Sequence, residues 1–159
     1  LLFRSPTCTK TDKEIALELA EIAGVDAEEF GLAMFKAGTS LVGKSIEEIY
    51  NQDYKAFNIG DAKVGIAQVN TMDIDGFAPL KAEMLEYMEN LCVENGFDTA
   101  VLLLTDVINA TSEVFVAGSH PEYVENAFNV QLVEHQANLP GVISRKKQVV
   151  PAITRAINA

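Results

Sequence analysis

The sequence is poor in basic residues and in cysteine. Of its 159 residues, 12 are Lys or Arg and 23 are Asp or Glu, which gives a net charge of −11. A protein that binds nucleic acid along its length needs a broad basic surface that releases many counterions, so we do not expect this class of protein. Cys8 and Cys92 form neither a paired metal-binding spacing nor a disulfide framework, which predicts reduced thiols and a cytoplasmic location.

Long apolar runs and the common catalytic motifs are missing too. No apolar segment approaches the roughly 20 residues that a membrane-spanning helix needs, so no membrane partner is expected. A Gly-rich phosphate loop and a nucleophile elbow are both absent from the sequence. His120 and His135 have no helical partner three or four residues away, so they do not predict a metal site. The residues alone therefore predict no catalytic side chain and no metal ligand in this chain.

The pattern of apolar residues predicts one α/β domain over residues 1–159, with a mixed β-sheet flanked by helices on both faces. Residues 53–59 and 63–70 flank Gly60-Asp61, as in a β-hairpin. The apolar run 100–105 is typical of a strand that is buried on both faces. Further elements are expected as helices at 12–23, 26–36, 78–94 and 121–128, as a short helix capped by Ser45-Ile-Glu-Glu48, and as a strand at 114–117.

Helix boundaries can be predicted from capping residues. Thr11 and Glu14 have the spacing of a capping box at the start of the first helix, and Gly24 follows its end. Asp26 is the expected N-cap of the second helix, which Gly38 is expected to stop.

The tripeptide Arg145-Lys146-Lys147 is the most distinctive feature, because no Asp or Glu follows Glu134. If Ser144 caps a helix here, three cations occupy its first turn, where each costs about 0.3–1 kcal/mol against the helix dipole. A phosphate group would offset this repulsion, because free backbone amides and basic side chains would converge on it. Two alternatives remain open: the helix begins at Pro151 with residues 142–150 extended, or the charges are simply solvated.

Six segments together resemble the C-terminal domain of the manganese-dependent (family II) inorganic pyrophosphatases, in the DHH phosphoesterase superfamily. They are Leu2–Thr9, Ala23–Asp26, Lys36–Gly38, Asp53–Phe57, Ile66–Asn70 and Gly141–Pro151. The resemblance covers essentially the whole chain. The string Ser144-Arg-Lys-Lys-Gln148, with Pro151 after it, is more similar to pyrophosphatases than to the related exopolyphosphatases.

The resemblance implies a substrate-binding role for three residues, Lys55, Arg145 and Lys146, which would hold diphosphate. Lys147 is expected to be a surface residue. Without the resemblance, Lys55 would also be interpreted as a surface lysine. In that family an N-terminal domain carries an Asp-His-His motif and binds manganese, or magnesium or cobalt, for the attack of water on diphosphate. This chain has no such motif, so it resembles the C-terminal (DHH-associated) domain without its catalytic domain and is expected to be inactive alone.

The resemblance also implies partners and leaves alternatives. The expected partners are metal-bound diphosphate, the N-terminal domain of the same polypeptide and, in the full-length enzyme, a second copy as a homodimer. An autonomous, non-catalytic module that binds phosphate or nucleotides would explain the same basic string. The lid domain of an exopolyphosphatase is a third interpretation.

Overall fold

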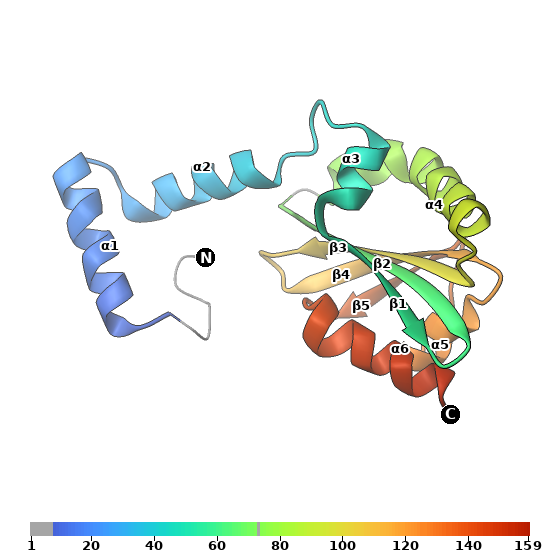
Figure 1. The fold of residues 1–159 in the computed structure, drawn as a ribbon. Coiled ribbons are helices and arrows are strands. Elements are labelled where there is room, and N and C mark those ends of the chain that lie inside the picture. The colour runs from blue at the N-terminus through green and yellow to red at the C-terminus, as the bar shows by residue number, and fades with distance from the viewer. Residues whose placement is uncertain (1–7, 73) are drawn as a thin grey trace. The chain divides into compact units, whose positions relative to one another are not determined.

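The computed structural model describes residues 8–72 and 74–159 (Figure 1). The segment Leu2–Thr9 that contributed to the resemblance therefore lies mostly outside the described residues. The chain divides into two compact units, one up to Ser40 and the other Leu41–Ala159. Each unit is described by itself.

The first helix, α1, spans Lys10–Ala23 and begins with a capping box. Thr9 Oγ1 accepts a hydrogen bond from the Asp12 amide at 3.2 Å, and the Asp12 carboxylate accepts one from the Thr9 amide at 2.8 Å. The predicted box of Thr11 and Glu14 was therefore wrong by two residues. Thr9 and Asp12 have the same spacing as Thr11 and Glu14, and the earlier pair adds one more N-terminal half-turn to the helix.

Helix α2 spans Ala27–Thr39, and the predicted N-cap Asp26 is confirmed by bonds from the amides of Glu28 and Glu29. The helix continues through Gly38, because glycine lowers helix propensity without removing a backbone donor. In α1 and α2 together, the only buried residue is Gly31. The large apolar side chains exposed in this unit are Ile15, Leu17, Leu19, Ile22, Val25, Phe30, Met34 and Phe35.

The second unit contains a mixed five-stranded sheet, as the sequence predicted. Its strands are β1 Tyr54–Ile59, β2 Ala62–Thr71, β3 Thr99–Asp106, β4 Thr111–Gly118 and β5 Gln136–Pro140. They lie side by side in chain order. The pair β2–β3 is parallel and the other pairs are antiparallel. The parallel pair is connected by the longest helix of the unit, because parallel neighbours need a crossover.

Helices cover both faces of this sheet (Figure 1). They are α3 Ile46–Tyr50 and α4 Lys81–Asn95 on one face, and α5 Glu122–Phe128 and α6 Val150–Ile157 on the other. Two 3₁₀ turns, Asn51–Asp53 and Asp75–Leu80, and a π-helical turn, Arg145–Val149, complete the unit. The predicted flanking helices are thus confirmed.

Strand β3 divides the core into two layers. Leu102 and Leu104 pack with Tyr50 and Phe77 under α3 and α4, while Val101, Leu103 and Ile153 pack under α5 and α6. All of these side chains are fully buried. The continuous apolar run that predicted a doubly covered strand therefore reflects burial on both faces.

Further elements of the second unit differ from the sequence prediction. The helix expected at 78–94 begins at Lys81, after a 3₁₀ turn that contains Pro79. Strand β5 was not predicted, because Gln136–Pro140 has no clear alternation of apolar residues. Its position is set by pairing with β4, from Phe115 opposite Gln136 onward. Within the described residues, no helix has the length and apolar character that crossing a membrane requires.

Candidate functional site

The sequence suggested that a helix begins either after Ser144 or at Pro151, and the structure contains both features in one continuous segment. Ser144 Oγ accepts a hydrogen bond from the Lys147 amide at 3.2 Å, so Ser144 is the N-cap as predicted. The π-helical turn Arg145–Val149 follows and continues into α6, which has Pro151 in its first turn. The alternative of an extended segment over 142–150 is therefore wrong for the part from Arg145 onward. Single π-helical turns are frequent at functional sites.

The carboxamide of Gln68, on β2, holds this segment to the sheet. Its Oε1 accepts a hydrogen bond from the Arg145 amide at 3.0 Å, and its Nε2 donates to the Ile143 carbonyl at 3.0 Å. The same Nε2 donates to Thr105 Oγ1 at 2.9 Å. Both ends of one amide are thus satisfied, which fixes the backbone at the start of the π-helical turn.

Two further polar side chains complete the support. Ser112 Oγ donates to the Val142 carbonyl at 2.7 Å and lies 2.8 Å from Thr105 Oγ1. Gln148 Oε1 accepts from the amides of Ile143 and Ser144 at 2.9 and 3.0 Å. The roles of Gln68, Ser112 and Gln148 were not predicted. The available signal for Gln68 was its polar side chain in the otherwise apolar stretch 64–69 of its strand, whereas Ser112 lies between Thr111 and Glu113 and had no such signal.

Arg145 is buried, with 7% of its surface exposed. Its Nη2 lies 2.6 Å from Asp53 Oδ1, and its Nη1 donates to the Asp53 carbonyl. Nη1 also donates to the Ile66 carbonyl at 3.4 Å. The buried cation is therefore paired with a carboxylate that directly precedes β1, and its guanidinium is engaged rather than open to a ligand.

Lys55 lies close to this pair. In the β1–β2 ladder Lys55 is opposite Ile66, whose carbonyl Arg145 reaches. Directly opposed residues point to the same face of a sheet, so Lys55 shares the α6 face with the buried Ile66. Its side chain is exposed. The structure thus brings Lys55 and Arg145 together, although they are 90 residues apart in the sequence.

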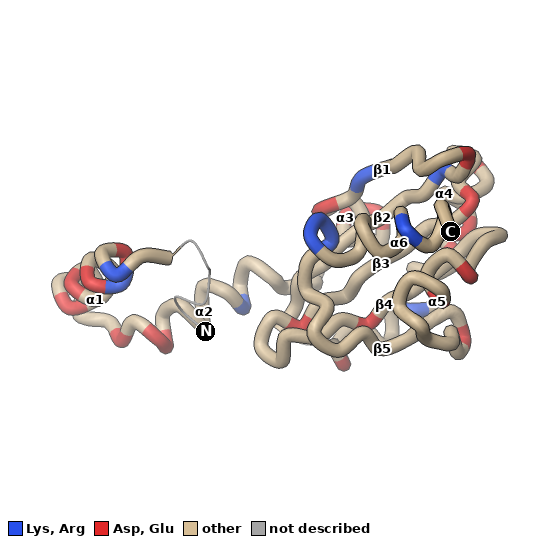
Figure 2. Tube along the Cα trace, turned by 90° about the horizontal axis from the view of Figure 1, so that it is seen from below, with Lys and Arg blue, Asp and Glu red and all other residues tan. Residues whose placement is uncertain are grey.

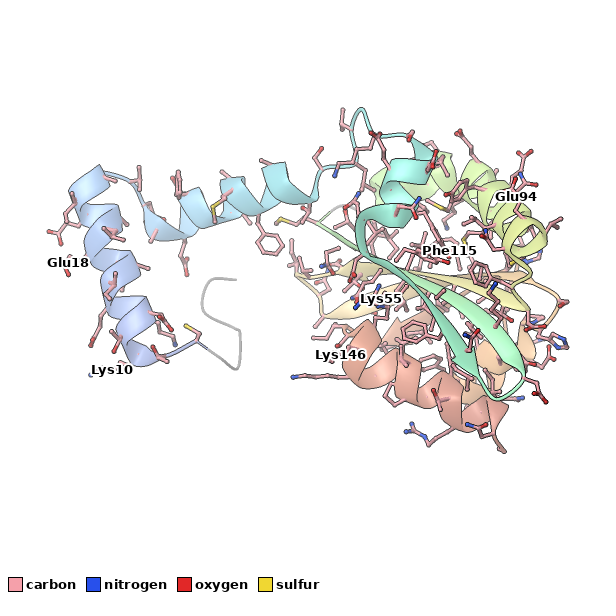
Figure 3. The ribbon with its side chains drawn as sticks, in the orientation of Figure 1. Lys10, Glu18, Lys55, Glu94, Phe115 and Lys146 are labelled. Atoms are coloured by element: carbon pink, nitrogen blue, oxygen red, sulfur yellow. The ribbon has the colours of Figure 1, made fainter. Side chains whose placement is uncertain are left out.

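Lys146 is also exposed and lies at the same end of the sheet as Lys55, with its side chain extending away from the helix (Figure 3). Neither lysine forms an ion pair with any residue that the structure describes. We call Lys55, Arg145 and Lys146 the basic cluster. Acidic residues outnumber basic ones over the rest of the chain, so this concentration of positive charge is local (Figure 2).

The backbone amides of the helix start are mostly occupied. The Arg145 amide donates to Gln68 and the Lys147 amide donates to Ser144. Within the described residues, the Lys146 amide is the one in this first turn without an acceptor. Several free backbone amides were expected to converge on a phosphate group, but only one such donor remains. The positive charge at this helix start therefore comes mainly from the side chains.

Asp106 and the two histidines have hydrogen-bond partners within the chain. Asp106 lies at the end of β3, and its carboxylate accepts bonds from Asn109 and from the Ile108 amide. Partial burial raises the pKa of Asp106, but these hydrogen bonds outweigh it and lower the pKa overall. His120 Nδ1 lies 2.7 Å from Glu122 Oε1, and His135 Nδ1 lies 3.2 Å from the Val116 carbonyl.

No group of three or more His, Cys, Asp or Glu side chains is placed to hold a metal ion within residues 8–72 and 74–159. A site for manganese or cobalt does not fit the described residues.

Fold and site together define an α/β domain that presents cations beside the C-terminal end of a parallel strand pair. The chain belongs to the DHHA2 domain family, whose profile matches residues 32–156.

Individual relatives match nearly the whole chain. A cobalt-dependent inorganic pyrophosphatase of Clostridium perfringens is 58% identical over 157 residues, which are 99% of this chain and 29% of that protein. A probable manganese-dependent inorganic pyrophosphatase of Clostridium acetobutylicum is 52% identical over 99% of this chain and 51% of that protein. The chain thus spans about half, or less, of the curated relatives that it matches.

A solved structure shares the fold. The crystal structure of a Methanococcus jannaschii protein assigned to the family II inorganic pyrophosphatases superposes with a TM-score of 0.79 at 45% identity. The match covers 99% of this chain and 52% of that chain.

Proposed function

We propose that this chain is the substrate-binding C-terminal part of an inorganic pyrophosphatase that hydrolyses diphosphate to two phosphates. The observation that carries the proposal is the identity of 58% and 52% to two pyrophosphatases over nearly the whole chain. Their names also specify cobalt and manganese. We assign the metal to the part of the polypeptide beyond this chain, since the described residues form no site for it.

Within this function each member of the basic cluster has a separate role. Lys55 and Lys146 are exposed and unpaired by carboxylates in the described chain, so they attract the anionic substrate as mobile point charges. Arg145 is held by Asp53 and offers a planar guanidinium, which can form two parallel bonds to phosphate oxygens when the carboxylate is displaced. Phosphoryl transfer depends mainly on such positioning and charge stabilisation.

The first test separates the chain from the complete enzyme. Phosphate release from diphosphate is measured with manganese, cobalt or magnesium, once with this chain and once with the full-length protein. We expect release by the full-length protein and none by the chain. Turnover by the chain alone would refute the assignment of the catalytic metals to another part of the polypeptide.

The second test addresses the cluster in the full-length protein. Arg145→Lys keeps the charge but loses the planar fork, so KM should rise and turnover should fall. Lys146→Ala should raise KM by about tenfold or more, which corresponds to one charge-assisted contact. Lys147→Ala is the matched control, because Lys147 is the neighbouring exposed lysine. Equal effects at Lys146 and Lys147 would remove Lys146 from the site.

The remaining interpretations are distinguishable outcomes. Tight, metal-independent binding of diphosphate or nucleotides by this chain would indicate an autonomous phosphate-binding module. A preference of the full-length protein for long polyphosphates would indicate an exopolyphosphatase. The proposal also includes a cytoplasmic location and a homodimer without nucleic-acid partners. The free thiols of Cys8 and Cys92 are consistent with a reducing compartment.

A further inference from the structure

Gln68 belongs to a row of three polar side chains on the α6 face of the sheet. The other two are Thr105 on β3 and Ser112 on β4, and each of these is only 1% exposed. Residues two positions apart in a strand share a face, and the neighbours of the row at this spacing are fully buried under α5 and α6: Ile66, Leu103 and Val114. Polar groups in such surroundings lower stability unless they are hydrogen-bonded, so their partners are informative.

The hydrogen bonds of this row run in one direction. Ser112 Oγ donates to the Val142 carbonyl, so its single hydrogen is not available to Thr105. Thr105 Oγ1 therefore donates to Ser112 Oγ and accepts from Gln68 Nε2. A flipped Gln68 carboxamide would place two acceptors against each other, so the row fixes which end of this amide carries the donors.

The orientation of this amide determines where Arg145 lies. Gln68 Oε1 accepts a hydrogen bond from the Arg145 amide, and the second hydrogen of Nε2 goes to the Ile143 carbonyl. The guanidinium of the same arginine reaches the carbonyl of Ile66, two residues before Gln68 on β2. One strand thus holds Arg145 at both its backbone and its side chain, and Lys146 follows directly from this backbone. Both donors of Gln68 are used within the chain, so any role in the reaction is indirect.

We propose that Gln68 is a positioning residue for the hydrolysis of diphosphate, which acts through Arg145 and Lys146 and does not contact the substrate. This inference rests on the proposed function. A displacement of about 1 Å in a group that positions a substrate can lower the rate about a hundredfold. Lys55 is placed by the pairing of β1 with β2, so it still attracts the substrate when the Gln68 carboxamide is lost. Loss of Gln68 should therefore affect turnover more than substrate binding.

The first experiment measures kinetics of the full-length protein with Gln68→Met, which keeps the length of the side chain. We expect kcat to fall at least about tenfold, while KM changes less than about threefold. The matched control is Thr99→Val, at the other end of β3, which removes a buried hydroxyl that donates to the His120 carbonyl at 2.8 Å. It should lower Tm without changing kcat. An unchanged kcat in Gln68→Met would overturn the proposal.

A double variant tests whether Gln68 acts through Arg145. If it does, Gln68→Met combined with Arg145→Lys should lose no more kcat than the more affected single variant. Losses that multiply would show independent action and would contradict the proposal. Thr105→Val and Thr105→Ser repeat the test without changing Gln68, and only the valine variant should lose turnover, because serine keeps the hydroxyl. Equal turnover in these two variants would also contradict it.

Amide hydrogen exchange separates this inference from the proposed function. In the full-length Gln68→Met variant, exchange in the segment 142–147 should be at least about tenfold faster than in the wild type, with exchange in β3 unchanged. If the wild type releases no phosphate from diphosphate, the proposed function fails, and exchange still decides whether Gln68 positions the basic cluster. Unchanged exchange in 142–147 would overturn that positioning.

Discussion

At the residue scale, Arg145 shows what the sequence could and could not predict. The tripeptide and its N-cap could be recognised locally, because Ser144 and its neighbours are adjacent in the sequence. The burial of Arg145 against Asp53 could not, since it depends on a contact between residues 92 positions apart. The local sequence is the same whether the Arg145 side chain is exposed or is buried and paired with Asp53. Only the tertiary structure distinguishes these two cases.

Asp53 competes with any anion for Arg145, and Asp53→Asn tests this. The pair is 2.6 Å apart, so removing the carboxylate should tighten binding of diphosphate to this chain by about fivefold, measured calorimetrically. The free energy of unfolding should fall by about 1 kcal/mol, because water screens a carboxylate that is 56% exposed.

The control for Asp53→Asn is Asp61→Asn, at the hairpin turn after β1, which changes the net charge equally. If both variants tighten binding to the same extent, the effect is general electrostatics. Weaker binding in Asp53→Asn would mean that Asp53 orients Arg145 for the substrate.

The thiol of Cys92 gives a prediction about pH. Burial raises its pKa from 9.0 to about 11, so the thiol of the unfolded chain ionises first as the pH rises. The unfolded state then binds fewer protons, and the free energy of unfolding should decrease between about pH 9 and 11. Urea unfolding of this chain is compared with the Cys92→Ala variant. An identical decrease in the two proteins would attribute the slope to other groups.

At the element scale, the elements that the sequence predicted well are those with strong local signals. The hairpin of β1 and β2 has a turn residue, Gly60, with a φ of +59°, and β3 has an uninterrupted apolar run. Strand β5 and the π-helical turn lack such signals. Both are determined by hydrogen bonds to other parts of the sheet, from β4 and from Gln68. Tertiary contacts therefore determine these two elements.

The end of β4 depends on a glycine. Gly118 has a φ of +101°, and a Cβ there would lie 2.6 Å from the Asp98 carbonyl oxygen. Gly118→Ala should therefore lower the free energy of unfolding by about 2–4 kcal/mol, measured by urea titration.

Gly96→Ala is the matched control for Gly118→Ala. Gly96 has a φ of +64° but no heavy atom within 4 Å of the added Cβ, so only backbone strain of about 1 kcal/mol is expected. Equal losses in the two variants would show that the contact with Asp98 relaxes.

At the scale of the whole molecule, the two units should differ in stability. The sheet unit has its own two-layered core, whereas α1 and α2 together bury only Gly31. Limited proteolysis of this chain should therefore cleave within the first 40 residues and leave a product close to Leu41–Ala159. The Tm of that product should equal the Tm of the chain. A large decrease would mean that the helices stabilise the sheet unit.

The domain organisation was the least predictable property at this scale. Capping residues and helical periodicity identified α1 and α2 but contain no information about what covers them. The sequence was therefore interpreted as one domain over residues 1–159. The structure divides the chain into two compact units after Ser40, and the large apolar side chains of the first unit are exposed in it.

The ion pair of Asp53 and Arg145 also has a consequence for folding order. The strands lie in chain order, so most strand pairs can form soon after their residues become available, for example during synthesis. The contact between Asp53 and Arg145 instead joins the start of β1 to the last helical segment. The basic cluster is therefore completed last. A nascent chain that has not yet reached Arg145 already contains all five strands of the sheet but lacks two of the three members of the basic cluster.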